Sequence, residues 1–190
     1  RQMCIRDSIY KECGQLIALI DDIMKLSRLD EGSEELSAER VDLYDLSQKI
    51  LQELTPVAAK RGISLHMEGG RQTIQGVWRI LHEMIYNLCD NAIKYNKDGG
   101  AVTVRVTEEE DQVVVSVEDT GIGISEGQQD RVFERFYRVD KSHSRRVGGT
   151  GLGLSIVKHG AQYHNAQLSL DSEPGAGTTI TLRFPKQSAA

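Results

Sequence analysis

Two valine-rich strands joined by a short acidic turn restrict the fold of this chain more than any other feature. Residues 102–107 and 113–118 have the pattern of strands, and only residues 108–111 lie between them. So short a connection joins antiparallel neighbours, because parallel strands need a crossover of about a dozen residues. The sequence therefore predicts an antiparallel hairpin near its centre and disfavours a doubly wound parallel sheet.

Helices and further strands surround this hairpin. Leu43, Leu46, Ile50 and Leu54 recur at helical spacing. The same reasoning predicts helices over residues 43–61, 77–95 and 151–163, a short helix over 126–133, and strands over 63–67, 167–171 and 178–184. We expect an α+β fold, a two-layer sandwich whose mixed, largely antiparallel sheet is covered on one face by helices.

The first 31 residues have a different character. Ile9, Cys13, Leu16 and Ile20 form an apolar stripe along a predicted helix of about six turns over residues 9–29. The polar residues that follow offer nothing to cover this stripe, so we expect it to pack on an absent segment or a second copy. We divide the chain into a helical segment (1–31), a linker (32–40), a domain (41–186) and a tail (187–190).

Composition excludes several classes of protein. With 23 basic and 28 acidic residues the net charge is −5, so the chain as a whole does not attract nucleic acid or anionic lipid. Cys4, Cys13 and Cys89 are an odd number without metal-ligand spacing, which argues against a disulfide framework or a zinc site. No apolar run reaches the roughly 18 residues of a membrane helix, so we expect a soluble piece of chain.

A glycine run precedes the last predicted helix. Residues 148–153 read Gly-Gly-Thr-Gly-Leu-Gly. Glycines at a helix start leave backbone N–H groups and the positive end of the helix dipole accessible to a phosphate. The run completes neither the Walker pattern nor the dinucleotide fingerprint, which needs glycine where Ile156 stands. A flexible hinge loop remains the alternative for this run taken alone.

The predicted helix 77–95 carries a polar face. Glu83, Asn87, Asn91 and Lys94 follow one another at intervals of four, four and three residues, which places them on one side of a helix. Amide oxygens suit Mg²⁺ and a lysine suits phosphate. A solvated outer face is the alternative, but two asparagines at one-turn spacing are poor helix formers and make it less favoured.

A third candidate site follows the second strand of the hairpin, where the sequence reads Asp119-Thr-Gly-Ile-Gly123. An ionised carboxylate only accepts hydrogen bonds, which suits an exocyclic amino group such as that of adenine. An aspartate that caps a turn is the competing interpretation.

Together these segments resemble the catalytic, ATP-binding domain of sensor histidine kinases, within the superfamily of DNA gyrase and mismatch-repair ATPases. Five segments appear in the order and spacing of that family's N box, first glycine box, F box, second glycine box and terminal Gly-x-Gly-Thr: residues 87–95, 119–123, 133–136, 149–153 and 175–178. The resemblance covers residues 41–185 and implies the histidine kinase/gyrase-type fold. Residues 22–31 resemble the end of the second helix of the family's dimerisation and phosphoacceptor hairpin, so one long helix should precede the sheet.

The resemblance also implies roles around the adenine base. Asp119 would accept a hydrogen bond from the adenine amino group, and Tyr95 would line the base pocket. Gly121 and Gly123 would make room for the purine, and the Thr178 hydroxyl would support the pocket.

At the phosphate end the resemblance implies that Asn87 holds Mg²⁺ and that Asn91 lies beside the nucleotide. Lys94 and Arg138 would reach the phosphates. Glu83 stands where hydrolytic members of the superfamily carry a general base. The segment that would close over the phosphates consists of Gly149, Thr150, Gly151, Leu152 and Gly153.

The chain lacks one part of a complete kinase. No His-Glu-x-x-Thr-Pro acceptor motif is present, and His82 belongs to the predicted helix that carries the N box. The other histidines, His66, His143, His159 and His164, have surface or packing contexts. His164-Asn165 stands where the family commonly has Gly-Gly, and Asn can adopt the left-handed conformation there.

The resemblance thus implies a protein-histidine kinase fragment that donates the γ-phosphoryl of ATP to a histidine outside these residues, for relay to a response regulator aspartate. The parent would be a homodimer through the hairpin. Nucleic acid is not an expected partner. We expect the fragment in the cytoplasm and the parent in the cell membrane, through absent upstream segments. The alternatives are a nucleotide-binding regulatory or dimerisation module without transfer, and a related ATPase that uses Glu83 as base.

Overall fold

The computed structural model describes residue 20, residues 37–139 and residues 150–186. The predicted helix 9–29 apart from Ile20, most of the linker, and the tail lie outside the described residues. So do His143 and Gly149.

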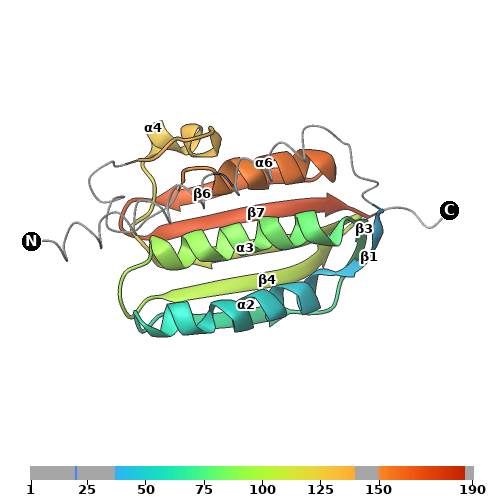
Figure 1. Cartoon of the computed structure of the whole chain (residues 1–190), viewed down its shortest axis with the longest axis horizontal. Helices are drawn as coiled ribbons and strands as arrows, with labels where there is room; N and C mark the ends of the chain where they lie inside the picture. The colour runs from blue at the N-terminus through green and yellow to red at the C-terminus, as the bar shows by residue number, and fades with distance from the viewer. Residues whose placement is uncertain (1–19, 21–36, 140–149, 187–190) are drawn as a thin grey trace, which may run out of the picture.

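The core of the fold is a five-stranded sheet (Figure 1). Its strands lie in the spatial order β2 (Ser64–Gly69), β4 (Ala101–Glu109), β5 (Gln112–Asp119), β7 (Gly177–Pro185) and β6 (Gln167–Glu173). Only β2 and β4 pair in parallel, and the other three pairs are antiparallel. The predicted hairpin is the β4–β5 pair, and the prediction of a mixed, largely antiparallel sheet is confirmed.

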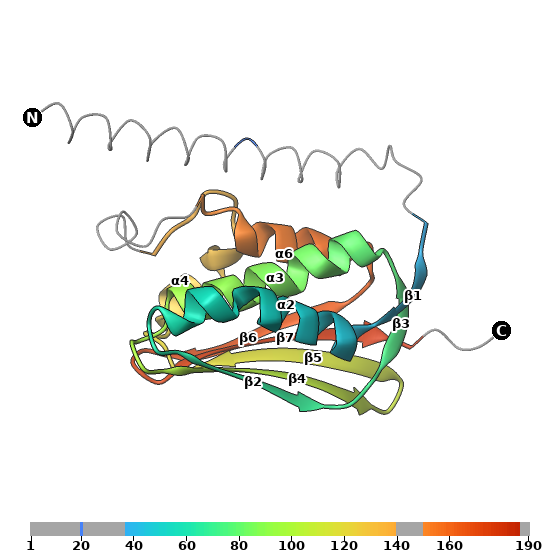
Figure 2. The same ribbon diagram turned by 60° about the horizontal axis from the view of Figure 1, so that its bottom comes forward.

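Three helices lie side by side on one face of this sheet (Figures 1 and 2). They are α2 (Leu43–Ala59), α3 (Trp78–Lys94) and α6 (Gly153–Tyr163). Each turns an apolar stripe toward the strands, and together they build one hydrophobic core. In α3 this stripe includes Leu81, Met84, Ile85 and Leu88, all buried. The α+β two-layer sandwich is therefore confirmed.

The structure adds a small sheet that the sequence analysis did not predict. β1 (Glu39–Asp42) pairs antiparallel with β3 (Thr73–Gly76). Asp42 also begins α2, because its Oδ1 accepts the backbone N–H groups of Tyr44 and Asp45 at 3.0 and 3.1 Å. The first described strand of the fold thus begins at Glu39, within the last residues of the expected linker.

The segment after β5 forms two short helices in place of one predicted helix, α4 (Glu126–Gln129) and the 3₁₀ turn η1 (Arg131–Phe133). Figure 1 shows α4 beyond α6, outside the three-helix layer. No helix in the described part of the chain is long and apolar enough to cross a membrane.

The contact between α3 and α6 determines where the candidate site forms. A Cβ on Gly160 would lie 2.4 Å from the Met84 sulfur, so the absence of a side chain lets the two helices approach closely. At the other end of α6 the same kind of approach brings Gly153 next to Asn87 and Asn91. The helices therefore run antiparallel, and the start of α6 faces the C-terminal half of α3.

Candidate functional site

The predicted polar face of α3 is present and half-buried, not a fully solvated outer face. Glu83, Asn87, Asn91 and Lys94 are all of intermediate exposure. The Asn87 amide nitrogen donates to the backbone carbonyl of Glu83 at 2.7 Å, one turn earlier. This bond fixes the amide so that its oxygen, Oδ1, points to the start of α6.

Gly153 begins α6 directly against that oxygen. A Cβ at position 153 would lie 2.8 Å from Asn87 Oδ1 and 3.6 Å from the Asn91 amide nitrogen. The structure thus brings two members of the predicted N box together with the second glycine box. A helix start with backbone N–H groups beside amide oxygens is an arrangement that can hold a phosphate and its cation.

The residues just before α6 are tied to the F box. Gly151 has a φ of +76°, and its carbonyl accepts the N–H of Phe136 at 2.9 Å. Leu152 is fully buried, and its N–H lies 3.3 Å from the Thr150 hydroxyl. This pairing brings Arg138, two residues after Phe136, into the same neighbourhood as the glycine box.

Lys94 has a partner that the sequence analysis did not identify. Its Nζ donates to Asp90 Oδ2 at 2.6 Å, four residues earlier on the same helix. A phosphate that recruits Lys94 would therefore compete with Asp90. Tyr95, the next residue, ends α3 and exposes 37% of its surface.

Asp119 ends β5 directly opposite Thr178 of β7. Burial raises the pKa of Asp119 to about 6, although the backbone N–H groups of Gly121 and Thr178 act to lower it. Its Oδ1 accepts the Gly121 N–H at 2.8 Å, so the turn-capping alternative also describes part of what this carboxylate does. A half-buried carboxyl with a perturbed pKa is typical of a binding site.

The glycines after Asp119 are needed by the protein's own backbone. A Cβ on Gly121 would lie 2.4 Å from the Tyr95 carbonyl oxygen, and that oxygen accepts the Ile122 N–H at 3.1 Å. A Cβ on Gly123, where φ is +68°, would lie 2.0 Å from the Glu173 carbonyl oxygen. Close packing between chain segments therefore accounts for both glycines before any ligand is considered.

The Thr178 hydroxyl belongs to a short chain of hydrogen bonds. It lies 2.8 Å from the Ser172 hydroxyl, which also accepts the Ile124 N–H at 2.8 Å. Thr178 thus connects β7 to the segment that follows the first glycine box.

The sequence analysis did not identify three residues that interact near the C-terminal end of α3. Arg61 donates to backbone carbonyls at the end of α3, and the Asn96 and Thr120 side chains hydrogen-bond to each other at 3.2 Å. In the sequence Arg61 marked only the end of the predicted helix 43–61, because spacing does not show which carbonyls an arginine reaches.

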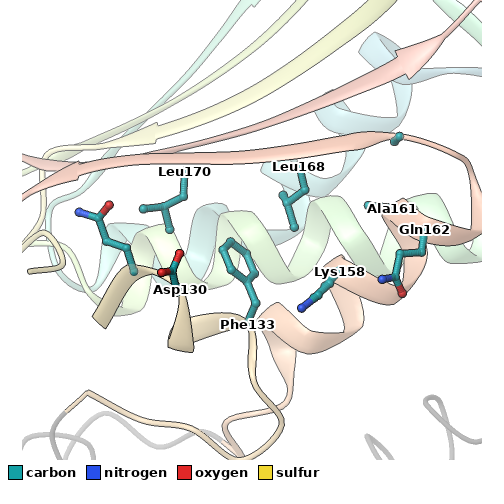
Figure 3. Close-up of a pocket in the computed structure, with 9 residues that line it drawn as sticks. Asp130, Phe133, Lys158, Ala161, Gln162, Leu168 and Leu170 are labelled. Atoms are coloured by element: carbon teal, nitrogen blue, oxygen red, sulfur yellow. The ribbon is translucent and has the colours of Figure 1, made fainter. Parts of the chain in front are cut away.

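A groove of about 460 Å³ lies away from these residues, between η1, α6 and β6 (Figure 3). Phe133 projects toward Leu168 and Leu170 of β6, and Lys158 lies at its side. No predicted site residue lines this groove, so it is distinct from the candidate nucleotide site.

Within residues 37–139 and 150–186 no group of three or more His, Cys, Asp and Glu side chains could hold a metal ion. The candidate ligand is instead the Asn87 amide oxygen, a hard donor of the kind that Mg²⁺ accepts alongside phosphate oxygens.

Comparison with known proteins places the chain in a family. The family described as "Histidine kinase-, DNA gyrase B-, and HSP90-like ATPase" matches residues 76–188. The sensor-like histidine kinase SenX3 of Mycolicibacterium smegmatis is 37% identical over 182 residues, which are 95% of this chain and 47% of that protein. The sensor histidine kinase WalK of Bacillus subtilis is 33% identical, over 92% of this chain and 29% of its own length. The chain thus spans less than half of these curated relatives.

Solved structures give the same result. The mycobacterial sensor histidine kinase MprB superposes with a TM-score of 0.69 at 27% identity, over 78% of this chain and 97% of that one. Full-length ShkA in complex with AMPPNP superposes with a TM-score of 0.81 at 26% identity, over 100% of this chain and 40% of ShkA.

Proposed function

The chain belongs to the histidine kinase-, DNA gyrase B- and HSP90-like ATPase family and matches the catalytic, ATP-binding domain of sensor histidine kinases; from this premise we propose that it donates the γ-phosphoryl of ATP to a histidine outside these residues. The bond between the γ-phosphorus and the β–γ bridging oxygen would break to leave ADP. A bond from the phosphorus to an imidazole nitrogen would form, and the imidazole would lose a proton. A response regulator aspartate would then accept the phosphoryl group.

The observation that carries this proposal is the approach of Gly153 to Asn87 and Asn91. It combines the N–H groups of a helix start with amide groups of a second helix in one place. Such transfer depends mainly on positioning and charge stabilisation. We propose that Asn87 Oδ1 binds Mg²⁺, which supplies charge neutralisation at the phosphates, and that Asn91 lies beside the nucleotide.

The base would bind just beyond the C-terminal end of α3, next to its cap residue Tyr95. Asp119 would accept from the adenine amino group between Tyr95 and Thr178. Gly121 and Gly123 would keep the backbone clear of the purine. The partial burial of Asp119 supports this assignment, because a carboxylate is a strong acceptor where water is excluded.

The cations and the second glycine box would serve the phosphates. Lys94 would exchange its contact with Asp90 for a phosphate oxygen, and Arg138 would approach from the F box side. Thr150, Gly151 and Leu152, with Gly149, would close over the phosphates.

The relatives' names suggest the wider setting. The relatives are named sensor histidine kinases, and we propose by analogy that the whole protein acts on a response regulator, forms a homodimer through the hairpin and is anchored in the cell membrane by segments outside this sequence. These features are proposals for the whole protein.

A transfer assay tests the proposal. The purified chain should bind ATP but not label itself with radioactive γ-phosphate, because no histidine here has the acceptor motif. An intact acceptor hairpin from the parent, supplied in trans, should be labelled slowly, since the covalent tether is gone. Asn87→Ala should abolish labelling.

The outcome separates the alternatives. Glu83→Gln should retain labelling at least in part, because the proton acceptor is expected beside the hairpin histidine. Phosphate release without the hairpin, lost in Glu83→Gln, would indicate the ATPase instead. Nucleotide binding with neither release nor transfer would indicate a regulatory module, and self-labelling would contradict our interpretation of the histidines.

A further inference from the structure

The end of α3 is held by an arginine from a distant part of the chain. Arg61, in the turn after α2, donates from Nη1 to the carbonyls of Ile93 and Lys94 at 2.8 and 3.0 Å, and from Nη2 to the Asn96 carbonyl at 2.6 Å. Its Nε donates to Asp98 at 2.9 Å. The last carbonyls of a helix lack partners within the helix, and one planar guanidinium here satisfies two of them together with the following turn.

The turn that Arg61 holds carries a buried amide. Asn96 is 4% exposed, and its amide nitrogen donates to the Ala101 carbonyl at 2.9 Å. Its Oδ1 accepts the Lys97 N–H at 3.0 Å and the Thr120 hydroxyl at 3.2 Å. The Thr120 hydroxyl in turn accepts the Ala101 N–H at 3.0 Å. Every polar atom of the Asn96 side chain thus has a partner, as burial requires.

The turn at residues 95–96 is in direct contact with the turn that follows Asp119. Thr120 follows Asp119 directly, and the Tyr95 carbonyl accepts the Ile122 N–H at 3.1 Å. The same carbonyl would be 2.4 Å from a Cβ on Gly121. Movement of the turn at residues 95–96 must therefore move the segment that holds the Asp119 carboxylate.

We propose that Arg61, Asn96 and Thr120 (the Arg61 network) are positioning residues that set the Asp119 carboxylate relative to Tyr95, and so determine the preference of the site for a 6-aminopurine. None of the three needs to touch the nucleotide. The inference rests on the proposed function, because it assumes that Asp119 accepts from the adenine amino group.

The physical reason is the directionality of that hydrogen bond. A purine with a 6-oxo group presents an acceptor where adenine presents a donor, and the Asp119 carboxylate should reject it. This discrimination depends on how accurately the carboxylate is placed. Contacts of the phosphates with the start of α6 are common to both nucleotides and involve none of the three side chains Arg61, Asn96 and Thr120.

The test compares the affinities of the chain for ATP and for ITP, its 6-oxo analogue, by calorimetry. Arg61→Gln and Thr120→Val remove network bonds, while Arg61→Lys and Thr120→Ser retain the charge or the hydroxyl. We expect Arg61→Gln and Thr120→Val to weaken ATP binding about three- to tenfold and ITP binding less, so that the ATP/ITP ratio falls. Thr120→Ser should restore most of the ratio.

A matched control is Arg71→Gln, since Arg71 is an exposed arginine whose ion pair with Asp45 at 3.2 Å lies outside the network. Thermal unfolding of each variant shows the temperature range in which it is folded. A purely structural role would lower the unfolding midpoint but leave the ATP/ITP ratio unchanged, and that result would overturn the proposal. If Arg61→Gln does not fold, the Thr120 pair decides in the same way.

The same measurements distinguish a failure of the proposed function from a failure of the network proposal alone. An unmutated chain without any preference for ATP over ITP would overturn both the network and the role of Asp119. A clear preference that survives in Arg61→Gln and Thr120→Val would overturn the network alone.

Discussion

A Cβ at Gly153 would lie 2.8 Å from Asn87 Oδ1, closer than side-chain atoms normally approach. The two residues are separated by 66 positions, and they meet only because α3 and α6 run antiparallel in one layer. Asn87 Oδ1 is the end of a side chain, so an added methyl group would rotate the amide without breaking the fold. A substitution at Gly153 can therefore change the orientation of the candidate Mg²⁺ ligand, while the ligand itself remains the amide of Asn87.

We expect Gly153→Ala to weaken Mg-ATP binding about three- to tenfold. The displaced amide must leave its preferred rotamer or the helices must separate, and a side chain forced off its rotamer costs about 0.5–1.5 kcal/mol. Alanine is the better helix former, which offsets part of any loss of stability. Calorimetry and thermal unfolding should thus show reduced affinity with a nearly unchanged midpoint.

Gly127→Ala is the matched control, because a Cβ on Gly127 would meet no atom within 4 Å and the residue lies in a short helix outside the site. It should leave the affinity unchanged. An equal loss of affinity in both variants would contradict the assignment of Gly153.

The second prediction concerns the metal. Asn87→Ala removes the amide oxygen that faces α6, and we expect it to abolish the part of ATP binding that depends on Mg²⁺. Titrations with Mg²⁺ and with EDTA should converge in this variant. If they remain as far apart as in the unmutated chain, Asn87 is not the ligand.

The third prediction concerns base recognition. Asp119→Asn should weaken ATP and ADP binding alike, by more than tenfold, because a hydrogen bond to a charged group contributes roughly 1.5–3 kcal/mol and the proposed bond would be made to the base, which ATP and ADP share. The same change should stabilise the ligand-free domain at pH 7.5 by about 1 kcal/mol, since burial disfavours the carboxylate it removes. Unchanged ADP affinity would contradict the assignment.

The raised pKa also predicts the pH dependence of binding. On the proposed assignment nucleotide binding needs the Asp119 carboxylate, and burial raises the pKa of this group to about 6 in the ligand-free chain. Affinity for ADP should therefore fall as the pH is lowered, by about tenfold between pH 7.5 and pH 5. Because ADP itself titrates, the measurement is the difference between the unmutated chain and Asp119→Asn, in which the Asp119 contribution is absent.

The main elements of the sheet and its helical layer could be predicted from the sequence because their signals are local. The predicted helix 77–95 is α3 at Trp78–Lys94, and the predicted hairpin is β4 and β5. Periodicity and turn composition within a few residues determine such elements. The short β1–β3 pair was missed because each strand has four residues, too few for a pattern.

The candidate site was predictable to the extent that its residues recur in a family pattern. What could not be predicted were contacts between segments far apart in the chain. The Lys94–Asp90 pair was within reach of a spacing argument, since it is an i, i+4 pair. The bonds of Arg61 to carbonyls more than 30 residues later depend on how the α2–β2 turn packs against the end of α3, which no local pattern encodes.

The last prediction concerns His164, which stands with Asn165 where the family commonly has Gly-Gly. Asn165 adopts the expected left-handed conformation, with a φ of +52°. His164 Nε2 accepts the Val77 N–H at 3.1 Å, and Nδ1 lies 2.8 Å from the Gly160 carbonyl, to which it must donate. The ring is therefore neutral, with its proton on Nδ1, and it ties α6 to the start of α3.

Burial lowers the pKa of His164 below its usual value of about 6.5. The unfolded chain then takes up this proton before the folded chain does, so the stability that His164 provides is complete above about pH 6.5 and is lost as the pH falls through its folded-state pKa. Asp119 acts in the opposite direction over much of the same range. Because the pKa of Asp119 is raised in the folded chain, the folded chain takes up this proton at a higher pH than the unfolded chain does. Protonation of Asp119 therefore favours folding as the pH falls through about 6.

The two contributions can be separated by comparing the unmutated chain with His164→Gln at each pH, because Asp119 is common to both. The difference in unfolding midpoint should be largest above pH 7 and should shrink toward pH 5. His66→Gln is the control, since His66 is exposed on β2, and it should give a small difference at every pH. A difference for His164→Gln that stays constant from pH 5 to pH 8 would show that the ring contributes packing alone and that its protonation is not coupled to folding.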